Sequence, residues 1–352
     1  MIRARGAFAL VASAVSLHAA CSPQLSLEGR TCPCVAGYFC CESTGYCLPD
    51  DEDVATCEET RKKKDTTQTA NDWTLVEEIA RANVRCFATD PDAAYWMTAE
   101  GKIEAHRTAA GPAIVTERFS LPADPVTACG MARSGASLYV TLEGGSVLRL
   151  SVTKDADGTI RLGLRADRLG VGELMAPIAL AAAGDVLYVA DRDAKAIARL
   201  DGEVTTEIAK TDGAPKEVLV AGADLLWIDE AGLRRRPLEG GETQTMHGGG
   251  VAHLAVHEGT VFYVEAKHVW SQSLSGGDAK TLTVEPGATI FAIDGARIYF
   301  DEGEHMARMD LGGGYAEPAF LRRASEGAPL FFTVDATRFL WGTPKAIHMV
   351  RR

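Results

Sequence analysis

Nine cysteines are the residues of this 352-residue sequence best suited to covalent chemistry. Six of them fall within one short segment, a density typical of disulfide-rich exported proteins. Because so short a segment cannot bury enough apolar surface to fold on a core, we expect disulfides to hold it together. The six cysteines are Cys32, Cys34, Cys40, Cys41, Cys47 and Cys57. Their connectivity is open, since the spacing selects no single pairing.

A zinc cluster is the alternative interpretation of the same segment. Structural zinc sites use paired C-x2-C knuckles, which these spacings do not contain. The adjacent Cys40 and Cys41 resemble those of knottin-like and other small disulfide-rich modules. We therefore predict a disulfide-rich module over residues 32–57.

Two cysteines further along the chain occupy corresponding places in a repeat. Cys86 precedes Tyr95 by nine residues, and Cys129 precedes Tyr139 by ten. Both are expected in the innermost strands of neighbouring repeat units, where their Cα atoms come within reach of a bond. We predict a mutual Cys86–Cys129 disulfide, and two free buried thiols are the alternative.

Histidines are the natural candidates for metal ligands. His253 and His257 are four residues apart, but the surrounding pattern is that of a strand, which separates them by roughly 13 Å. His247 is set apart from them by the glycines at 248–250. We therefore predict no metal site and no cofactor.

Acidic residues recur at one place in the repeat, the turn after the aromatic run. Turns of a repeat fold that share a position lie on one face, where a ring of carboxylates would attract a cationic ligand, a protein or a glycan. The alternative is that turns favour acids for local reasons and for solubility. The residues of this acidic face are Glu100, Glu143, Asp191, Asp193, Asp229, Glu230, Glu265, Asp301 and Glu302.

These residues must be positioned by a repeating fold. From residue 73 onward an aromatic residue recurs inside an apolar run. Gly-Gly pairs begin at Gly240, Gly276 and Gly312, at successive intervals of 36 residues. A period near 40 with four short strands per unit is typical of a β-propeller. The aromatic markers are Tyr95, Tyr139, Tyr188, Trp227, Tyr263, Tyr299 and Trp341. We predict an all-β, seven-bladed β-propeller over residues 73–352; six or eight blades, or an open sandwich, are the alternatives.

One unit carries a family resemblance. Its apolar-aromatic strand 186–191 ends in Asp191, and the I-x-R pattern of Ile197 and Arg199 leads to Gly202. This unit resembles the YWTD and NHL families of propeller repeats, whereas the WD40 and kelch signatures are absent. The last unit, residues 330–350, has only three strands, so we expect residues 73–79 to supply its outer strand and close the ring.

The N-terminus has the features of an export signal. Arg3 and Arg5 precede the uncharged stretch 6–17, which is too short to span a bilayer. The small residues before Cys21 resemble a bacterial lipoprotein cleavage site, at which the cysteine becomes the lipidated N-terminus. His18 stands where that pattern has an aliphatic residue, so ordinary signal cleavage stays open.

The predicted export signal determines where we expect the protein and how we divide its N-terminal region. If Cys21 carries lipid, eight cysteines remain to pair. Ser22 after it resembles lipoproteins sorted to an outer membrane; a secreted protein is the alternative. We expect a signal peptide at residues 1–20, a tether at 21–31 and a linker at 58–72, with membrane contact through the lipid only.

The sequence leaves two function classes open. A net charge of −12 argues against nucleic-acid binding, which needs a basic face. The sequence has neither a G-x-S-x-G elbow nor a G-x-x-x-x-G-K-[ST] phosphate loop, so we assign no catalytic residue. We expect a cell-envelope binding or scaffold protein of unknown ligand. The alternative is a propeller lyase or hydrolase with a loop-built site at the channel mouth.

Overall fold

The structure is a computed structural model of the chain. It describes residues 38–41, 46–49, 76–80, 82–107, 115–120, 129–142, 144–163, 167–283, 287–303, 305–314, 316–321, 327–334 and 338–351. The chain divides into two compact units, Met1–Asn71 and Asp72–Arg352. Among these described residues no helix is both long and apolar enough to cross a membrane.

The first unit contains one described hairpin. Strands β1 (Tyr38–Cys41) and β2 (Tyr46–Pro49) pair antiparallel, with Cys40 opposite Cys47. Cys21, Cys32, Cys34 and Cys57 lie outside the described residues, as do the predicted signal peptide, tether and linker. The connectivity of the six module cysteines therefore stays a prediction.

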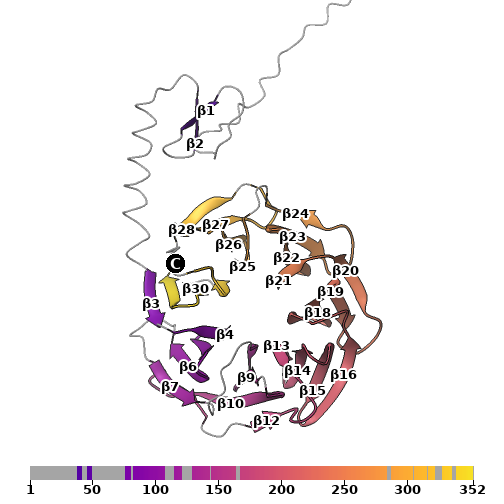
Figure 1. Cartoon of the computed structure of the whole chain (residues 1–352). Helices are drawn as coiled ribbons and strands as arrows, with labels where there is room; N and C mark the ends of the chain where they lie inside the picture. The colour runs from indigo at the N-terminus through magenta and orange to yellow at the C-terminus, as the bar shows by residue number, and fades with distance from the viewer. Residues whose placement is uncertain are drawn as a thin grey trace, which may run out of the picture. The chain divides into compact units, whose positions relative to one another are not determined.

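The second unit is all-β and consists of seven antiparallel sheets. Figure 1 shows the sheets arranged in a ring, and the first strands of neighbouring sheets contact one another near its centre. Each sheet is one blade of a propeller, so the predicted seven-bladed β-propeller is confirmed. We number the blades in chain order from β4.

The first three blades follow the order of the chain. Blade 1 is β4 (Val84–Thr89), β5 (Ala93–Thr98), β6 (Lys102–Arg107) and β7 (Val115–Ser120). Blade 2 is β8 (Met131–Ser134), β9 (Ser137–Leu142), β10 (Ser146–Lys154), β11 (Ile160–Leu162) and β12 (Asp167–Leu169). Blade 3 is β13 (Pro177–Ala183), β14 (Val186–Asp191), β15 (Ala196–Asp201) and β16 (Val204–Lys210).

The other four blades complete the ring. Blade 4 is β17 (Glu217–Ala221), β18 (Asp224–Asp229), β19 (Gly232–Pro237) and β20 (Gln244–Gly248). Blade 5 is β21 (Val251–His257), β22 (Thr260–Glu265), β23 (His268–Ser273) and β24 (Lys280–Thr281). Blade 6 is β25 (Phe291–Ile293), β26 (Arg297–Asp301), β27 (His305–Asp310) and β28 (Glu317–Leu321). Blade 7 is β29 (Phe331–Val334), β30 (Arg338–Gly342), β31 (Ile347–Arg351) and β3 (Val76–Ala80).

The second strand of each blade carries the aromatic marker because a neighbouring blade covers each of its faces. Alternate side chains of β14 face opposite neighbours, so Leu187 packs with blade 2 residues and Tyr188 with blade 4 residues. All six residues of β5 and of β9 are buried. Such strands become continuous apolar runs rather than alternating ones.

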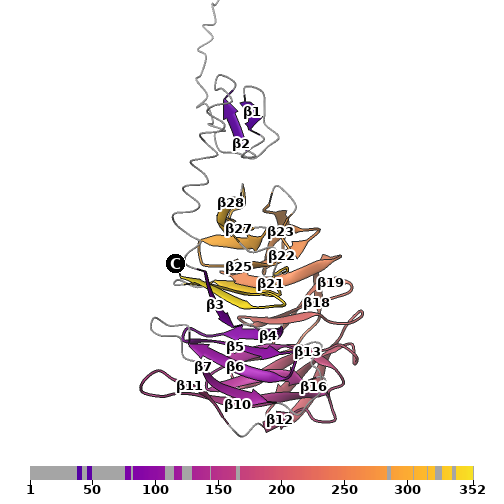
Figure 2. The same cartoon turned by 60° about the vertical axis from the view of Figure 1, so that its left-hand side comes forward.

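Blade 7 is closed by a strand from the start of the unit. Strand β3 pairs antiparallel with β31, with Val76 opposite Val350, and both views place it beside that blade (Figures 1 and 2). The described strand runs from Val76 to Ala80, one residue beyond the expected 73–79, and residues 73–75 lie outside the described part. Ile79 and Ala80 pack against the core between blades 7 and 1.

Blade 2 explains the longest spacing of the repeat. Its third strand, β10, is nine residues long and pairs with β9, with β12 and with the additional strand β11. The extra hairpin lengthens the distance between the markers Tyr139 and Tyr188 without adding a blade.

A disulfide joins blades 1 and 2. Cys86 and Cys129 are bonded, with their Cα atoms 5.5 Å apart. Cys86 lies on β4 as expected, but Cys129 lies two residues before β8 and not within the innermost strand. The connection that enters blade 2 therefore carries the bond.

Candidate ligand-binding site

Three of the acids predicted to form a face are buried inside the propeller. Asp191, Asp229 and Asp301 end the second strands of blades 3, 4 and 6 and are each at most 3% exposed. The carboxylate of Asp191 accepts hydrogen bonds from the backbone N–H groups of Met175, at 2.7 Å, and Ala176, at 2.9 Å. It thereby fixes the connection that enters its own blade.

The other two buried carboxylates also bind protein groups. Asp229 accepts from the backbone N–H of Ala231 at 2.9 Å, and Asp301 accepts from the Thr289 hydroxyl at 3.3 Å. Buried carboxylates that are fully engaged in this way stabilise the turns around them. These three buried acids therefore stabilise turns and connections of their own blades.

The remaining acids of the predicted face differ in their surroundings. Glu265 binds His247 at 2.9 Å and Glu302 binds His305 at 2.9 Å. The exposed members are Glu100, Asp193 and Glu230. Glu143 lies outside the described residues.

Removing the Asp191 carboxylate should destabilise the fold strongly. Asp191→Ala leaves the N–H group of Met175 and the buried N–H group of Ala176 without their acceptor, which we expect to lower the free energy of unfolding by about 3 kcal/mol. The matched control is Asp193→Ala, since Asp193 is exposed and, among the described residues, pairs only with its neighbour Arg192. Urea unfolding of both variants measures the difference; equal midpoints would contradict the structural role of Asp191.

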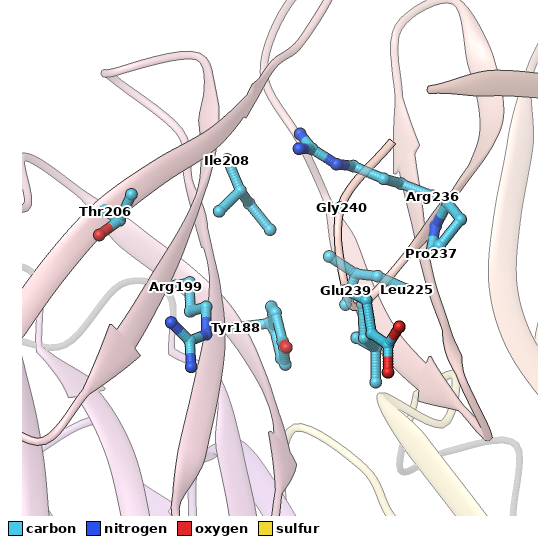
Figure 3. Close-up of a pocket in the computed structure, with 10 residues that line it drawn as sticks. Tyr188, Arg199, Thr206, Ile208, Leu225, Arg236, Pro237, Glu239 and Gly240 are labelled. Carbon is cyan, nitrogen blue, oxygen red and sulfur yellow. The ribbon is translucent and has the colours of Figure 1, made fainter. Parts of the chain in front are cut away.

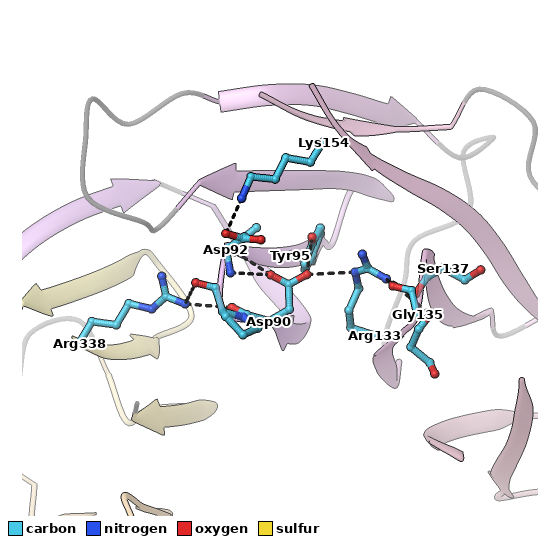
Figure 4. A network of polar contacts seen from close by, with 11 residues as sticks. Asp90, Asp92, Tyr95, Arg133, Gly135, Ser137, Lys154 and Arg338 are labelled. Carbon is cyan, nitrogen blue, oxygen red and sulfur yellow. Dashed lines mark hydrogen bonds and ion pairs between the residues drawn. The ribbon is translucent and has the colours of Figure 1, made fainter. Parts of the chain in front are cut away.

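A second group of charged residues links blades 7, 1 and 2, next to the place where the ring closes. We call this group the seam network. Asp90, in the turn between β4 and β5, accepts from the Arg133 guanidinium of blade 2 at 3.1 Å and from the Tyr95 hydroxyl at 2.8 Å. Arg338 of blade 7 donates to the backbone carbonyl of Asp90 at 2.9 Å, and Lys154 pairs with Asp92 at 2.6 Å (Figure 4).

The charged side chains of this network are bound to other protein groups. Arg133 also donates to the backbone carbonyls of Gly135 and Ser137 and lies over the Tyr95 ring, 5.8 Å from its centroid. Asp90 further caps its own turn by accepting from the N–H groups of Asp92 and Ala93. Each charge is therefore directed at protein, and the network is a link between blades 7, 1 and 2.

The buried Tyr95 hydroxyl gives the network a testable pH dependence. Burial, reinforced by the Asp90 charge, raises the pKa of Tyr95 to about 12. Between pH 10 and 12 an unfolded tyrosine loses its proton while the native one keeps it, so stability falls as the pH rises. We expect a shallower fall in Tyr95→Phe by urea unfolding. Burial also raises the pKa of Tyr263, which affects both proteins equally, so equal slopes would contradict the expectation.

His247 of blade 4 and His253 of blade 5 pair with separate carboxylates. His247 binds Glu265, and His253 Nδ1 lies 3.3 Å from Glu217, whose carboxylate also accepts from the backbone N–H of His253. Within the described part of the chain, no three His, Cys, Asp or Glu side chains gather in an arrangement that could hold a metal ion. The Glu217 contact fixes β21 where its register shifts and His253 adopts a positive φ of 52°.

A concave site of the propeller lies between blades 3 and 4. Its volume is about 590 Å³, which suits a small-molecule ligand. Figure 3 shows Tyr188 and Arg199 on the blade 3 side and Arg236 on the blade 4 side, reaching across the gap. The lining residues are Tyr188, Arg199, Thr206, Ile208, Leu225, Arg236, Pro237, Leu238, Glu239 and Gly240.

The walls of the pocket are two rows of paired residues. On blade 3, Arg199 of β15 stands between Tyr188 of β14 and Thr206 of β16. On blade 4, Leu225 of β18 stands opposite Arg236 of β19. Because side chains alternate along a strand, these rows face each other across the blade interface.

The three consecutive arginines of β19 differ in their partners. Arg234 pairs with Asp212 at 2.6 Å, and Arg235 pairs with Asp224 at 3.0 Å. Arg236 has no hydrogen-bond or ion-pair partner among the residues that the structure describes. The pocket therefore contains an available guanidinium beside apolar walls, a site that the sequence analysis missed.

Comparisons with known proteins support the fold and assign no family. No protein-family model matches the chain, and no curated protein sequence matches it. The chain is similar to the solved structure of the computationally designed Ika8 protein, with a TM-score of 0.54 and 12% identity over 78% of this chain and 97% of that one. A chain of the nidogen/laminin complex gives a TM-score of 0.45 and 14% identity over 59% and 86%. At 12% identity, the likeness to the designed protein shows the fold alone.

Proposed function

We propose that this protein is an exported cell-envelope binding protein whose propeller holds a ligand in the pocket between blades 3 and 4. The observation that carries the proposal is the Arg236 guanidinium, which opens into this pocket with no protein partner in the described part of the chain. Unlike the seam network and the buried acids, this charge is free to bind a ligand. A pocket of apolar walls with a few converging polar groups is the usual form of a small-molecule site.

A fragment screen tests whether the pocket binds ligands. We expect bound fragments to collect between blades 3 and 4, as seen by crystallography or by amide shifts in NMR spectra. Ile208→Trp fills the pocket from the blade 3 wall and should abolish their binding. The matched control Val204→Trp places the same side chain on the same strand at a position that is 64% exposed, and binding should persist. Fragments that bind elsewhere, or equally well to Ile208→Trp, would overturn the proposal.

The location is the second part of the proposal. It is supported by the charged and apolar order of residues 1–20, by Cys21 and by the odd number of cysteines. Mass spectrometry of the N-terminus of the natural protein tests it. We expect a diacylated or triacylated Cys21; an unmodified chain that starts elsewhere would exclude the lipid anchor.

A further inference from the structure

The repeat allows each blade to be compared with its sister blades. In blades 1 and 6 the aromatic marker is a tyrosine that faces the following blade. Its hydroxyl donates to an aspartate five residues earlier, Tyr95 to Asp90 at 2.8 Å and Tyr299 to Asp294 at 3.2 Å. Each aspartate sits in the turn between the first two strands, so the tyrosine hydroxyl is satisfied within its own blade.

A second regularity involves the arginine beside the tyrosine. In blade 6, Arg308 stands opposite Tyr299, and its guanidinium lies 3.4 Å from Glu317 on the outer strand. In blade 2, Arg149 stands in the same row, between Tyr139 and Asp167 of the outer strand. An acid on the outer strand therefore stands beside the arginine in both blades.

Blade 3 has the same tyrosine and arginine but neither acid. Five residues before Tyr188 stands Ala183, which has no polar side chain. Opposite Arg199 on the outer strand stands Thr206 rather than an acid. The Tyr188 hydroxyl has no hydrogen-bond partner among the described residues, and both side chains line the pocket.

The charges around these groups leave the pocket able to bind an anion. Arg199 pairs with Asp201 at 2.6 Å, but that carboxylate is 54% exposed, and a guanidinium has further N–H donors to offer. Glu239 lines the pocket on the exposed turn after β19. Arg236 adds a second guanidinium from the facing blade (Figure 3).

From these two departures we infer that the pocket binds a ligand that ends in a carboxylate and carries an apolar group behind it. The inference rests on the proposed binding function. The carboxylate accepts from the guanidinium groups of Arg236 and Arg199 and from the Tyr188 hydroxyl, and charge-assisted bonds of this kind are the strong ones. The apolar group packs against Ile208, Leu225 and the Pro237 ring.

Paired probes that differ only in charge test the inference on the whole protein. Phenylacetate is compared with phenylacetamide, and a hexapeptide that ends in leucine with a free carboxylate is compared with the same peptide amidated. We expect each acid to bind at least about tenfold more tightly than its amide in calorimetric or NMR titrations. The tighter of the two acids shows whether the natural carboxylate comes from a small molecule or from a peptide end.

Variants tie this difference to blade 3. Thr206→Glu restores the acid of the sister blades at an exposed position, and it should weaken phenylacetate binding about tenfold or more without lowering the thermal midpoint. Arg236→Gln should have a similar effect. The matched control is Thr281→Glu, which adds the same charge on the outer strand of blade 5, also at an exposed position, and should leave binding unchanged.

The outcomes separate this inference from the proposed function. If the amides bind in the pocket as tightly as the acids and Thr206→Glu has no effect, the inference that the ligand ends in a carboxylate is wrong. The proposed binding function of the pocket would remain. Failure of both acids to bind would also overturn the inference. If the fragment screen also finds nothing in the pocket, the proposed function fails with it.

Discussion

A chain that begins at Asn83 is expected to unfold roughly 10 °C below one that begins at Ala70, or to aggregate. The shorter chain lacks β3 and leaves one edge of β31 unpaired. It also loses the packing of Ile79, Ala80 and Ala82 on the core between blades 7 and 1. Backbone pairing and apolar burial together make the loss about 4 kcal/mol or more. Calorimetry or circular dichroism measures the two thermal midpoints.

The chain that begins at Ala70 is the control for removing the N-terminus itself. It lacks the cysteine module but keeps β3, so its thermal midpoint should match that of the propeller in the full chain. Equal midpoints for the two shortened chains would contradict the role of β3 in closing the ring.

Loss of the Cys86–Cys129 bond is expected to have the next largest effect. The bond closes a loop with a sequence separation of 43 residues, so the entropy that it removes from the unfolded chain stabilises the propeller by about 4 kcal/mol. The Cys86→Ala, Cys129→Ala double variant keeps the buried position of Cys86 apolar. Urea unfolding of the chain that begins at Ala70 measures the effect without the module disulfides.

Reduction supplies the control for this prediction. A thiol reductant should lower the stability of the Ala70 chain to nearly that of the double variant and leave the variant unchanged. A double variant as stable as its parent would show that the contacts between blades 1 and 2 suffice without the bond.

The propeller could be predicted from sequence because packing between blades requires the same residue pattern in each blade. A second strand that is covered on both faces must be apolar throughout, which makes Tyr188 and Trp227 visible as regularly spaced markers. Closure followed from counting strands, since blade 7 has only three of its own. The extra strand β11 was not placed from the sequence, because the long spacing between Tyr139 and Tyr188 indicates an insertion but not where its strand lies.

The role of the acids could not be predicted in the same way. Asp191 and Asp193 are two residues apart in one turn, yet the first is buried and the second is exposed. Sequence position gives the turn but not the direction of each carboxylate, which depends on where the N–H groups of Met175 and Ala176 lie. The acidic face therefore divides into buried acceptors, histidine partners and a few exposed groups.

The pocket was missed for a related reason, although the sequence contains a signal for it. A pocket forms where two blades face each other, and the period of the repeat does not report on that interface. The signal is a departure from blades 1 and 6: Asp90 and Asp294 precede their tyrosines by five residues, whereas Ala183 precedes Tyr188. Comparing blades with one another, rather than with known motifs, would have found it.

A crystal structure of the protein with phenylacetate tests the central claim most directly. We predict that the carboxylate lies within hydrogen-bond distance of the Arg236 guanidinium and the Tyr188 hydroxyl, with the ring against Leu225 and Ile208. A structure in which phenylacetate is absent from the pocket, with Arg236 paired instead to Glu239, would contradict the claim.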